Sequence, residues 1–254
     1  MASSEREYRT SRLLTHMLSE IHGHTLIGRE LRSKVILDLG ANQGAFAHEM
    51  IRRYGCRVLA VEANPAMVAR IPPHPNLTVH HGAIAGHTGT LTLHLSSNPE
   101  ASTMLSDQGG GSVTVPCWTL PDFLRSYGMP ASNIALVKMD IEGAEIAALD
   151  ACPDPFLSAF PQLTIEFHDF LGWTPRAVVE RTVGRLEQLG FFPLKMWRSA
   201  WGDTLLVNRR RTRVAVAELQ YAKHVTRPLR ILKHAAMRLR APRGQAIGGS
   251  GATV

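Results

Sequence analysis

Apolar residues along this chain follow two alternating patterns. Short aliphatic and β-branched runs, as at residues 35–37, are typical of buried strands in parallel sheets. Segments with helical spacing that end at a glycine, as at 45–54 before Gly55, predict helices. Strands are thus predicted at residues 35–37, 57–61, 77–80, 90–95, 134–139, 163–167, 191–197 and 204–207, and helices at 4–21, 45–54, 121–127, 142–149 and 175–189, with a short helix opening at Pro65.

This alternation predicts an α/β protein with a Rossmann-like, seven-stranded and mostly parallel sheet that carries helices on both faces. The last two strands are expected to close the sheet as an antiparallel pair. We expect an N-terminal helical extension (1–32), one main domain (33–208) and a C-terminal tail (209–254). Ligands of such sheets bind at the carboxyl ends of the strands. Polar residues follow the strands there: Asp38, Glu62, Asp140 and the run 166–169.

Composition fits a folded soluble protein: 44% of the 254 residues are hydrophobic and 19% are charged. The three cysteines, Cys56, Cys117 and Cys152, form no CxxC pair, so we expect reduced thiols rather than a zinc site or disulfides. The N-terminus lacks the apolar core of a signal peptide, and no apolar run is long enough for a membrane span. The prediction is a cytoplasmic protein.

A cofactor site is predicted around the first strand-to-helix turn, residues 38–44. Gly40 permits a sharp turn, Gly44 permits close approach, and the helix N-terminus offers N–H donors. Glu62, at the end of the next strand, suits ribose hydroxyls, while Gly82 and Ala83 leave room for adenine. These features favour S-adenosylmethionine (SAM). A dinucleotide site is the alternative, although only the spacing Gly40-x-x-x-Gly44 is present; glycines that merely turn the chain are another.

Four motifs resemble the FkbM family of SAM-dependent methyltransferases: DLGANQG (38–44), VEANP (61–65), VKMDIEGAE (137–145) and IEFH (165–168). The resemblance covers about residues 33–208 and implies a class I methyltransferase fold and O-methylation of sugars, polyketides or related metabolites. It also implies that Ser102 and Thr103, in the polar Gly-rich loop 96–112, lie near the adenosine. The cofactor-binding residues predicted are Asp38, Gly40, Ala41, Asn42, Gly44, Glu62, Ala63, Asn64, Gly82, Ala83, Ser102, Thr103 and Asp140.

Catalysis is assigned to His168, with Glu166 and Asp140 on neighbouring strand ends. An alcohol needs a base to accept its proton, and histidine is the usual choice near neutral pH. The carboxylates would orient His168, bind acceptor hydroxyls or hold Mg²⁺, for which Asp140, Glu166 and Asp169 are the candidate ligands. A histidine that only supports the site is the alternative. We expect Glu142 and Glu145 to favour the start of a helix, and Trp173 to line the acceptor pocket or pack on the following helix.

Basic charge is concentrated in the tail. Residues 209–254 hold eleven Lys/Arg and one acid, Glu218, a net charge of +10 that leaves −3 for residues 1–208. Residues 229–240 have helical amphipathic spacing. The tail therefore suggests peripheral membrane contact, nucleic-acid binding, or packing on the domain or on the other chain of a homodimer. We favour packing, because aromatic residues that could stack on bases are nearly absent from the tail.

The expected acceptor is a small hydroxylated metabolite, most simply a saccharide. The alternatives are an RNA methyltransferase and a non-catalytic SAM- or RNA-binding protein.

Overall fold

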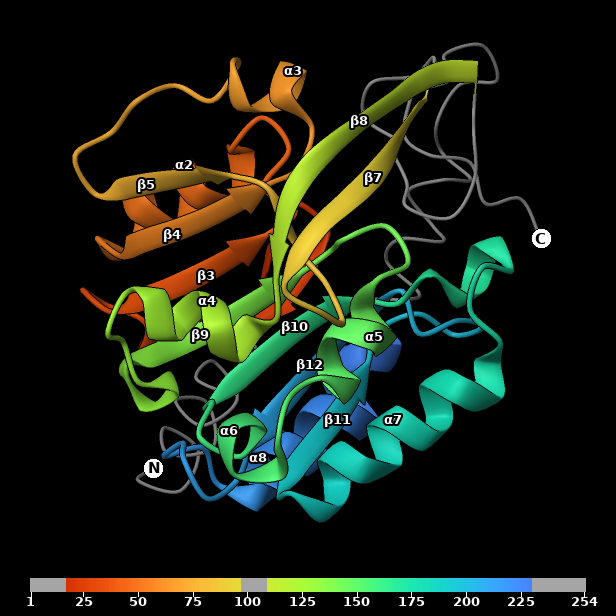
Figure 1. Cartoon of the computed structure of the whole chain (residues 1–254). Coiled ribbons are helices and arrows are strands. Elements are labelled where there is room, and N and C mark those ends of the chain that lie inside the picture. Colours follow the sequence, from red (N-terminus) through yellow and green to blue (C-terminus); the bar gives the residue numbers. More distant parts are fainter. Residues whose placement is uncertain (1–16, 97–108, 230–254) are drawn as a thin grey trace, which may run out of the picture.

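The computed structural model describes residues 17–96 and 109–229, and its centre is a seven-stranded sheet (Figure 1). Five neighbouring strands are parallel, and β12 runs antiparallel to β10 and β11 on either side of it. The predicted Rossmann-like α/β class is confirmed. In spatial order the strands are β11 (Phe191–Lys195), β12 (Asp203–Asn208), β10 (Gln162–Glu166), β9 (Ile134–Met139), β3 (Val35–Leu39), β4 (Arg57–Glu62) and β5 (Leu77–His81).

Helices cover both faces of this sheet. Successive strand residues point to opposite faces: Leu37 packs in a cluster with α4, α5, α6 and α7, whereas Ile36 packs in a second cluster with α2. A third cluster joins β11 and β12 to α8. The helices are α2 (Ala45–Tyr54), α3 (Pro65–Val68), α4 (Leu120–Ser126), α5 (Glu145–Asp150), α6 (Asp154–Leu157), α7 (Arg176–Gln188) and α8 (Val216–Tyr221), with 3-10 turns η1 (Gly28–Glu30), η3 (Ala131–Asn133) and η4 (His168–Leu171) and a π turn η5 (Ala222–Thr226).

A smaller sheet extends from the main one (Figure 1). Strands β7 (Gly89–Ser96) and β8 (Gly109–Trp118) form an antiparallel pair, and β6 (Ala83–Ile84) pairs with β8 in parallel. The strand predicted at 90–95 is confirmed. The predicted loop is wrong for Ser96, which ends β7, and for residues 109–112, which belong to β8; Ser102 and Thr103 lie outside the described residues.

The N-terminal segment forms a hairpin rather than the end of a helix. Strands β1 (Ser19–Ile21) and β2 (His24–Leu26) pair across His22 and Gly23, whose φ angles of 45° and 81° suit a tight hairpin turn. The predicted helix is therefore wrong for residues 19–21, while residues 4–16 lie outside the described part. Pairing, and burial of Ile21 and Leu26 against the α2 cluster, outweigh the helical spacing of Met17, Leu18 and Ile21.

The described part of the predicted tail packs on the sheet. Val214, Leu219 and Ala222 are buried against β11 and β12, and Glu218 accepts two hydrogen bonds from Arg29 at 2.7 and 2.8 Å. The amphipathic segment predicted at 229–240 lies almost wholly outside the described residues. Among the helices of residues 17–96 and 109–229, none has the length and apolar character needed to cross a bilayer.

Candidate active site

A pocket opens at the carboxyl ends of β3, β4 and β9, the edge at which the sequence predicted a ligand. Its walls combine the glycine turn after β3, the end of β4 with the residues that follow, and the segment after β9. Predicted site residues that line it are Gly40, Asn42, Glu62, Ala63, Asn64, Gly82, Ala83 and Asp140.

The turn after β3 brings two strand ends into contact. Gly40 has φ of +79°, and a Cβ atom there would lie 1.7 Å from the Asp140 carbonyl oxygen. Gly44, also at +79°, is the N-cap of α2, and a Cβ would lie 2.8 Å from Ile71. A side chain at Gly40 would collide with backbone in the pocket wall, whereas Gly44 does not line the pocket and is favoured by its left-handed φ and by the close Ile71 side chain.

Glu62 presents a fixed carboxylate to the pocket. One oxygen accepts a hydrogen bond from the Asn42 backbone N–H and the other from the Asn64 backbone N–H, both at 2.7 Å. Burial raises the pKa of Glu62, and these two N–H groups oppose that rise. Each oxygen keeps a further lone pair, so the carboxylate can accept hydrogen bonds from a diol.

Asp38 and Ala41 do not line the pocket. Asp38 is fully buried below the turn, where its Oδ1 lies 3.3 Å from Lys138 Nζ. The same ammonium donates a 2.6 Å hydrogen bond to the Gly40 carbonyl oxygen, and burial raises the pKa of Asp38. The Asp38–Lys138 pair thus supports the turn from beneath, whereas Ala41 packs in the α2 cluster.

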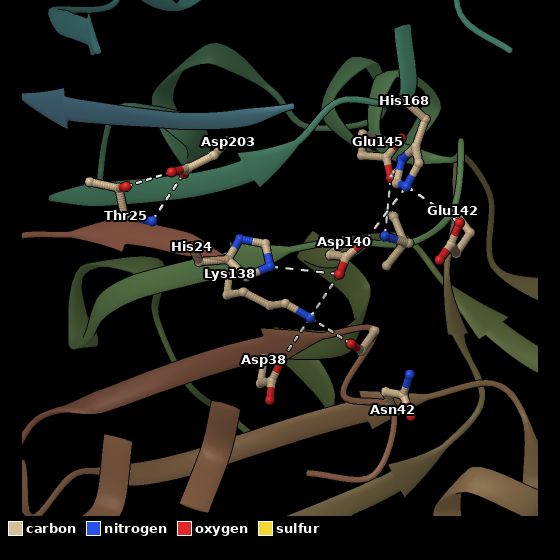
Figure 2. Close-up of polar contacts among 12 residues, drawn as sticks. His24, Thr25, Asp38, Asn42, Lys138, Asp140, Glu142, Glu145, His168 and Asp203 are labelled. Atoms are coloured by element: carbon tan, nitrogen blue, oxygen red, sulfur yellow. Dashed lines mark hydrogen bonds and ion pairs between the residues drawn. The ribbon is translucent and has the colours of Figure 1, made fainter. Parts of the chain in front are cut away.

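His168 lies beside this pocket, at the first position of η4, in contact with three carboxylates (Figure 2). Its Nδ1 is 3.0 Å from Glu145 Oε1, and its Nε2 is 3.3 Å from Glu142 Oε2 and 3.7 Å from Asp140 Oδ1. Glu145 also accepts backbone N–H groups from Ile141 and Gly143 at 3.0 and 3.2 Å. Glu145 therefore fixes the imidazole while it caps the segment before α5.

Charge in this group favours a protonated His168 in the ligand-free protein. Burial alone would lower the pKa of His168, but the hydrogen bond to Glu145 and the charges of Glu145, Glu142 and Asp140 raise it to about 9. Burial raises the pKa of Glu142 to about 7. Glu142 also has φ of +53°, a left-handed conformation that costs a non-glycine residue free energy and is common at functional sites.

Asp140 is the residue shared by the pocket and the His168 group. Burial would raise its pKa, but Lys138, His24 and His168 together lower it, so the carboxylate is ionised. His24 reaches it from the N-terminal hairpin, with Nε2 at 3.6 Å from Oδ2. The sequence does not identify His24, Lys138 and Glu145 as site residues: Lys138 and Glu145 belong to the VKMDIEGAE motif, but no local pattern shows that these three side chains contact Asp140 or His168.

The remaining predicted residues occupy different places. Glu166 lies within 4.8 Å of His24 and Asp140, counted between potential ligand atoms. Asp169 accepts a hydrogen bond from the Trp201 backbone N–H at 2.9 Å and belongs to neither group of potential metal ligands in the described part of the chain. Trp173 stacks on His168 with ring centroids 5.5 Å apart.

Solved methyltransferase structures resemble this chain at low identity. Precorrin-6y C5,15-methyltransferase from Geobacter metallireducens is 15% identical, with 77% of this chain and 84% of that chain covered and a TM-score of 0.39. Fibrillarin from Aeropyrum pernix, in complex with S-adenosyl-L-methionine, is 12% identical, with 69% and 66% covered and a TM-score of 0.38. The complex of the Haloferax volcanii Trm112 methyltransferase activator with a putative methyltransferase gives 10% identity, 92% and 88% coverage and a TM-score of 0.38.

Sequence comparison identifies the family of the chain. No curated protein matches it. The methyltransferase FkbM domain, however, matches residues 38–193, which include the glycine turn, Glu62, Asp140 and His168. This match spans more than half of the chain and agrees with the sheet order and with the strand-end position of the pocket. The protein therefore belongs to the FkbM family of methyltransferases.

Proposed function

We propose that this protein is a SAM-dependent O-methyltransferase that methylates a hydroxyl of a small metabolite, most simply a saccharide. One observation carries the proposal: the pocket around Glu62 and the carboxylates around His168 share Asp140 and Glu142. A cofactor in the pocket and an acceptor beside His168 would therefore meet at one edge of the sheet.

The pocket residues fit the cofactor that the family implies. The Glu62 carboxylate suits ribose hydroxyls, and Asn42 Oδ1 is buried without a hydrogen-bond partner among the described residues, so it is available to a ligand donor. Gly82 and Ala83 line one wall of the pocket, and their small size leaves room there for the adenine of the cofactor. At Gly82 a Cβ atom would lie 2.6 Å from both the Pro116 carbonyl oxygen and the Trp118 ring. SAM, when bound, supplies an electrophilic methyl group for in-line displacement.

The chain's own residues would then position the acceptor and accept its proton. His168 Nε2 faces Glu142 and Asp140, and Glu145 holds the opposite ring nitrogen. His168 is the proton acceptor in this proposal once its own proton has left to solvent, and Glu142 and Glu166 accept hydrogen bonds from neighbouring hydroxyls. A carboxylate-rich rim favours a neutral polyol over a phosphorylated acceptor, because like charges repel.

The cofactor assignment is tested by calorimetric titration of SAM into wild type and Glu62→Gln. A hydrogen bond to a charged group contributes about 1.5–3 kcal/mol, so SAM should bind the variant roughly 10- to 150-fold more weakly. The control is Glu49→Gln, since Glu49 lies on the outer side of α2 paired with Arg52 and Arg53. Equal affinities for wild type and Glu62→Gln would refute the assignment.

The acceptor is then sought with a panel of hydroxylated metabolites, in which methyl transfer from labelled SAM is measured. The expected result is transfer to a saccharide hydroxyl by wild type and loss of transfer in His168→Ala, with SAM binding retained. Transfer to RNA instead would overturn the acceptor class while leaving the cofactor assignment intact.

A further inference from the structure

Three potential metal ligands from separate elements converge beside the pocket. His24 comes from β2, Asp140 follows β9, and Glu166 ends β10. One nitrogen and two carboxylate oxygens from these residues all lie within 4.8 Å of one another. His24 lies outside the segment that matches the FkbM domain, so this grouping depends on the N-terminal hairpin of this chain.

The polar atoms of this group stand apart rather than in close contact. His24 is 2% exposed, yet its Nδ1 has no partner in the described part of the chain, and its Nε2 stands 3.6 Å from Asp140 Oδ2, beyond hydrogen-bond distance. Lys138 and His168 also stay 3.6 and 3.7 Å from the Asp140 carboxylate. Nε2 is the ring nitrogen of His24 that faces Asp140 (Figure 2), and because these separations exceed hydrogen-bond distance the Asp140 carboxylate, which is 26% exposed, can accept a further ligand.

The ligand geometry is fixed by the fold. Thr25, next to His24, donates its backbone N–H to Asp203 Oδ1 at 2.9 Å and its hydroxyl to Oδ2. Ile27 N–H donates to Gln162 Oε1 at 2.9 Å, and Gln162 donates back to the Ile27 carbonyl oxygen at 3.2 Å. The hairpin is thus held on β10 and β12, and His24 is positioned before any ion binds.

We propose that His24, Asp140 and Glu166 bind a divalent first-row transition-metal ion such as Mn²⁺. An imidazole with two carboxylates suits Mn²⁺, Fe²⁺ or Zn²⁺ better than Mg²⁺, which prefers oxygen ligands. Lys138 donates its short hydrogen bond to the Gly40 carbonyl oxygen, at 2.6 Å, and stands 3.6 Å from Asp140 Oδ2 (Figure 2), so the ion would share the Asp140 carboxylate with this ammonium.

A second group, Asp140, Glu142 and His168, also has ligand atoms within 4.8 Å. It is the weaker candidate, because Glu145 contacts His168 Nδ1 at 3.0 Å and Glu142 lies within hydrogen-bond distance of Nε2, at 3.3 Å, whereas His24 Nε2 stands 3.6 Å from Asp140. An ion bound by His24 would hold an oxygen atom of the acceptor next to His168. This role in acceptor binding rests on the proposed function, whereas ion binding itself does not.

The test is an electron paramagnetic resonance titration of Mn²⁺ into metal-free protein, in which the sharp signal of free Mn²⁺ reports the unbound ion. Wild type should bind one equivalent, and His24→Asn and Glu166→Gln should each bind more than about tenfold more weakly. His22→Asn, at an exposed histidine on the same hairpin turn, is the matched control. Thermal melting checks that His24→Asn folds, and Glu166→Gln provides an independent variant at a partly exposed position.

The outcomes separate this site from the cofactor site. Glu62→Gln should lose SAM affinity and keep Mn²⁺ binding, whereas Glu166→Gln should lose Mn²⁺ binding and keep SAM affinity. No Mn²⁺ binding to wild type, with or without saturating SAM, would overturn the proposal. Binding to wild type and to both folded ligand variants with equal affinity would overturn it as well.

Discussion

In the pocket wall, Gly40 is the position that tolerates a side chain least. Its positive φ, and the 1.7 Å that would separate a Cβ atom from the Asp140 carbonyl oxygen, exclude alanine without movement of the backbone. We expect Gly40→Ala to lower the free energy of unfolding by at least about 3 kcal/mol. Gly184→Ala, in the middle of α7 with open space around Cβ, should instead raise it by about 0.5–1 kcal/mol. Urea unfolding of both variants measures this; equal effects would contradict it.

Lys138 is the second residue whose replacement should be costly. Its side chain is 5% exposed, and its ammonium lies between the Asp38 and Asp140 carboxylates, at 3.3 and 3.6 Å. Lys138→Met removes the charge while it keeps most of the volume, so two carboxylates lose their cation. Breaking a buried pair in this way costs about 3–5 kcal/mol. Chemical denaturation should show this loss, and a change below about 1 kcal/mol, typical of surface pairs, would show that Lys138 is not needed for charge balance.

Residues of the site differ in how far the sequence identifies them. Glu62 and Asp140 can be predicted because each lies at the end of a predicted strand, and parallel strands bring such ends to one edge. His24 and Lys138 cannot be predicted as site residues, because their roles depend on which strands become neighbours and on a hairpin that packs against β10 and β12. Asp38 shows the opposite case: its motif indicates a ligand-facing carboxylate, but its side chain points below the turn towards Lys138.

Elements with strong local signals are those that the sequence predicts well. Helix α2 begins and ends where predicted, because Gly44 and Gly55 adopt left-handed conformations at its two ends. The sequence does not predict strand β8, because its first residues are glycines and it contains Pro116, features that usually weaken a strand. The sequence does not predict hairpin β1–β2 either, because three-residue strands have almost no periodicity and the hairpin is stabilised by contacts distant in sequence.

One such contact supports a prediction for the hairpin. Thr25 Oγ1 donates to the buried Asp203 carboxylate, a charged acceptor. Thr25→Val keeps the shape and removes this bond, so we expect a loss of about 1.5–3 kcal/mol and faster amide exchange in residues 19–27. Thr92→Val, on the exposed side of β7, should stay within about 0.5 kcal/mol of wild type. Unchanged exchange in the hairpin would show that the hydrogen bond from the Thr25 hydroxyl to Asp203 does not anchor it.

In the whole molecule, the main sheet separates two apolar clusters, and each of these clusters contains a buried cysteine. Cys56 belongs to the α2 cluster and Cys152 to the cluster under α5 and α7. Burial raises the pKa of Cys56 to about 11 and that of Cys152 to about 12. Because the thiolate is the reactive form, both should resist alkylation in the folded protein at pH 8 and react once unfolding restores ordinary pKa values.

This pair of thiols tests whether the two faces of the sheet unfold together. The strands between the clusters are shared, so loss of one layer exposes the other, and we expect Cys56 and Cys152 to be alkylated at the same rate across a urea series. Mass spectrometry of each cysteine peptide measures both rates in one sample. Cys117, in a separate four-residue cluster of the smaller sheet, should react at lower urea and serves as internal comparison. Earlier labelling of Cys56 than of Cys152 would mean that the α2 face opens alone, and the cofactor pocket, which shares the turn before α2, would then open with it.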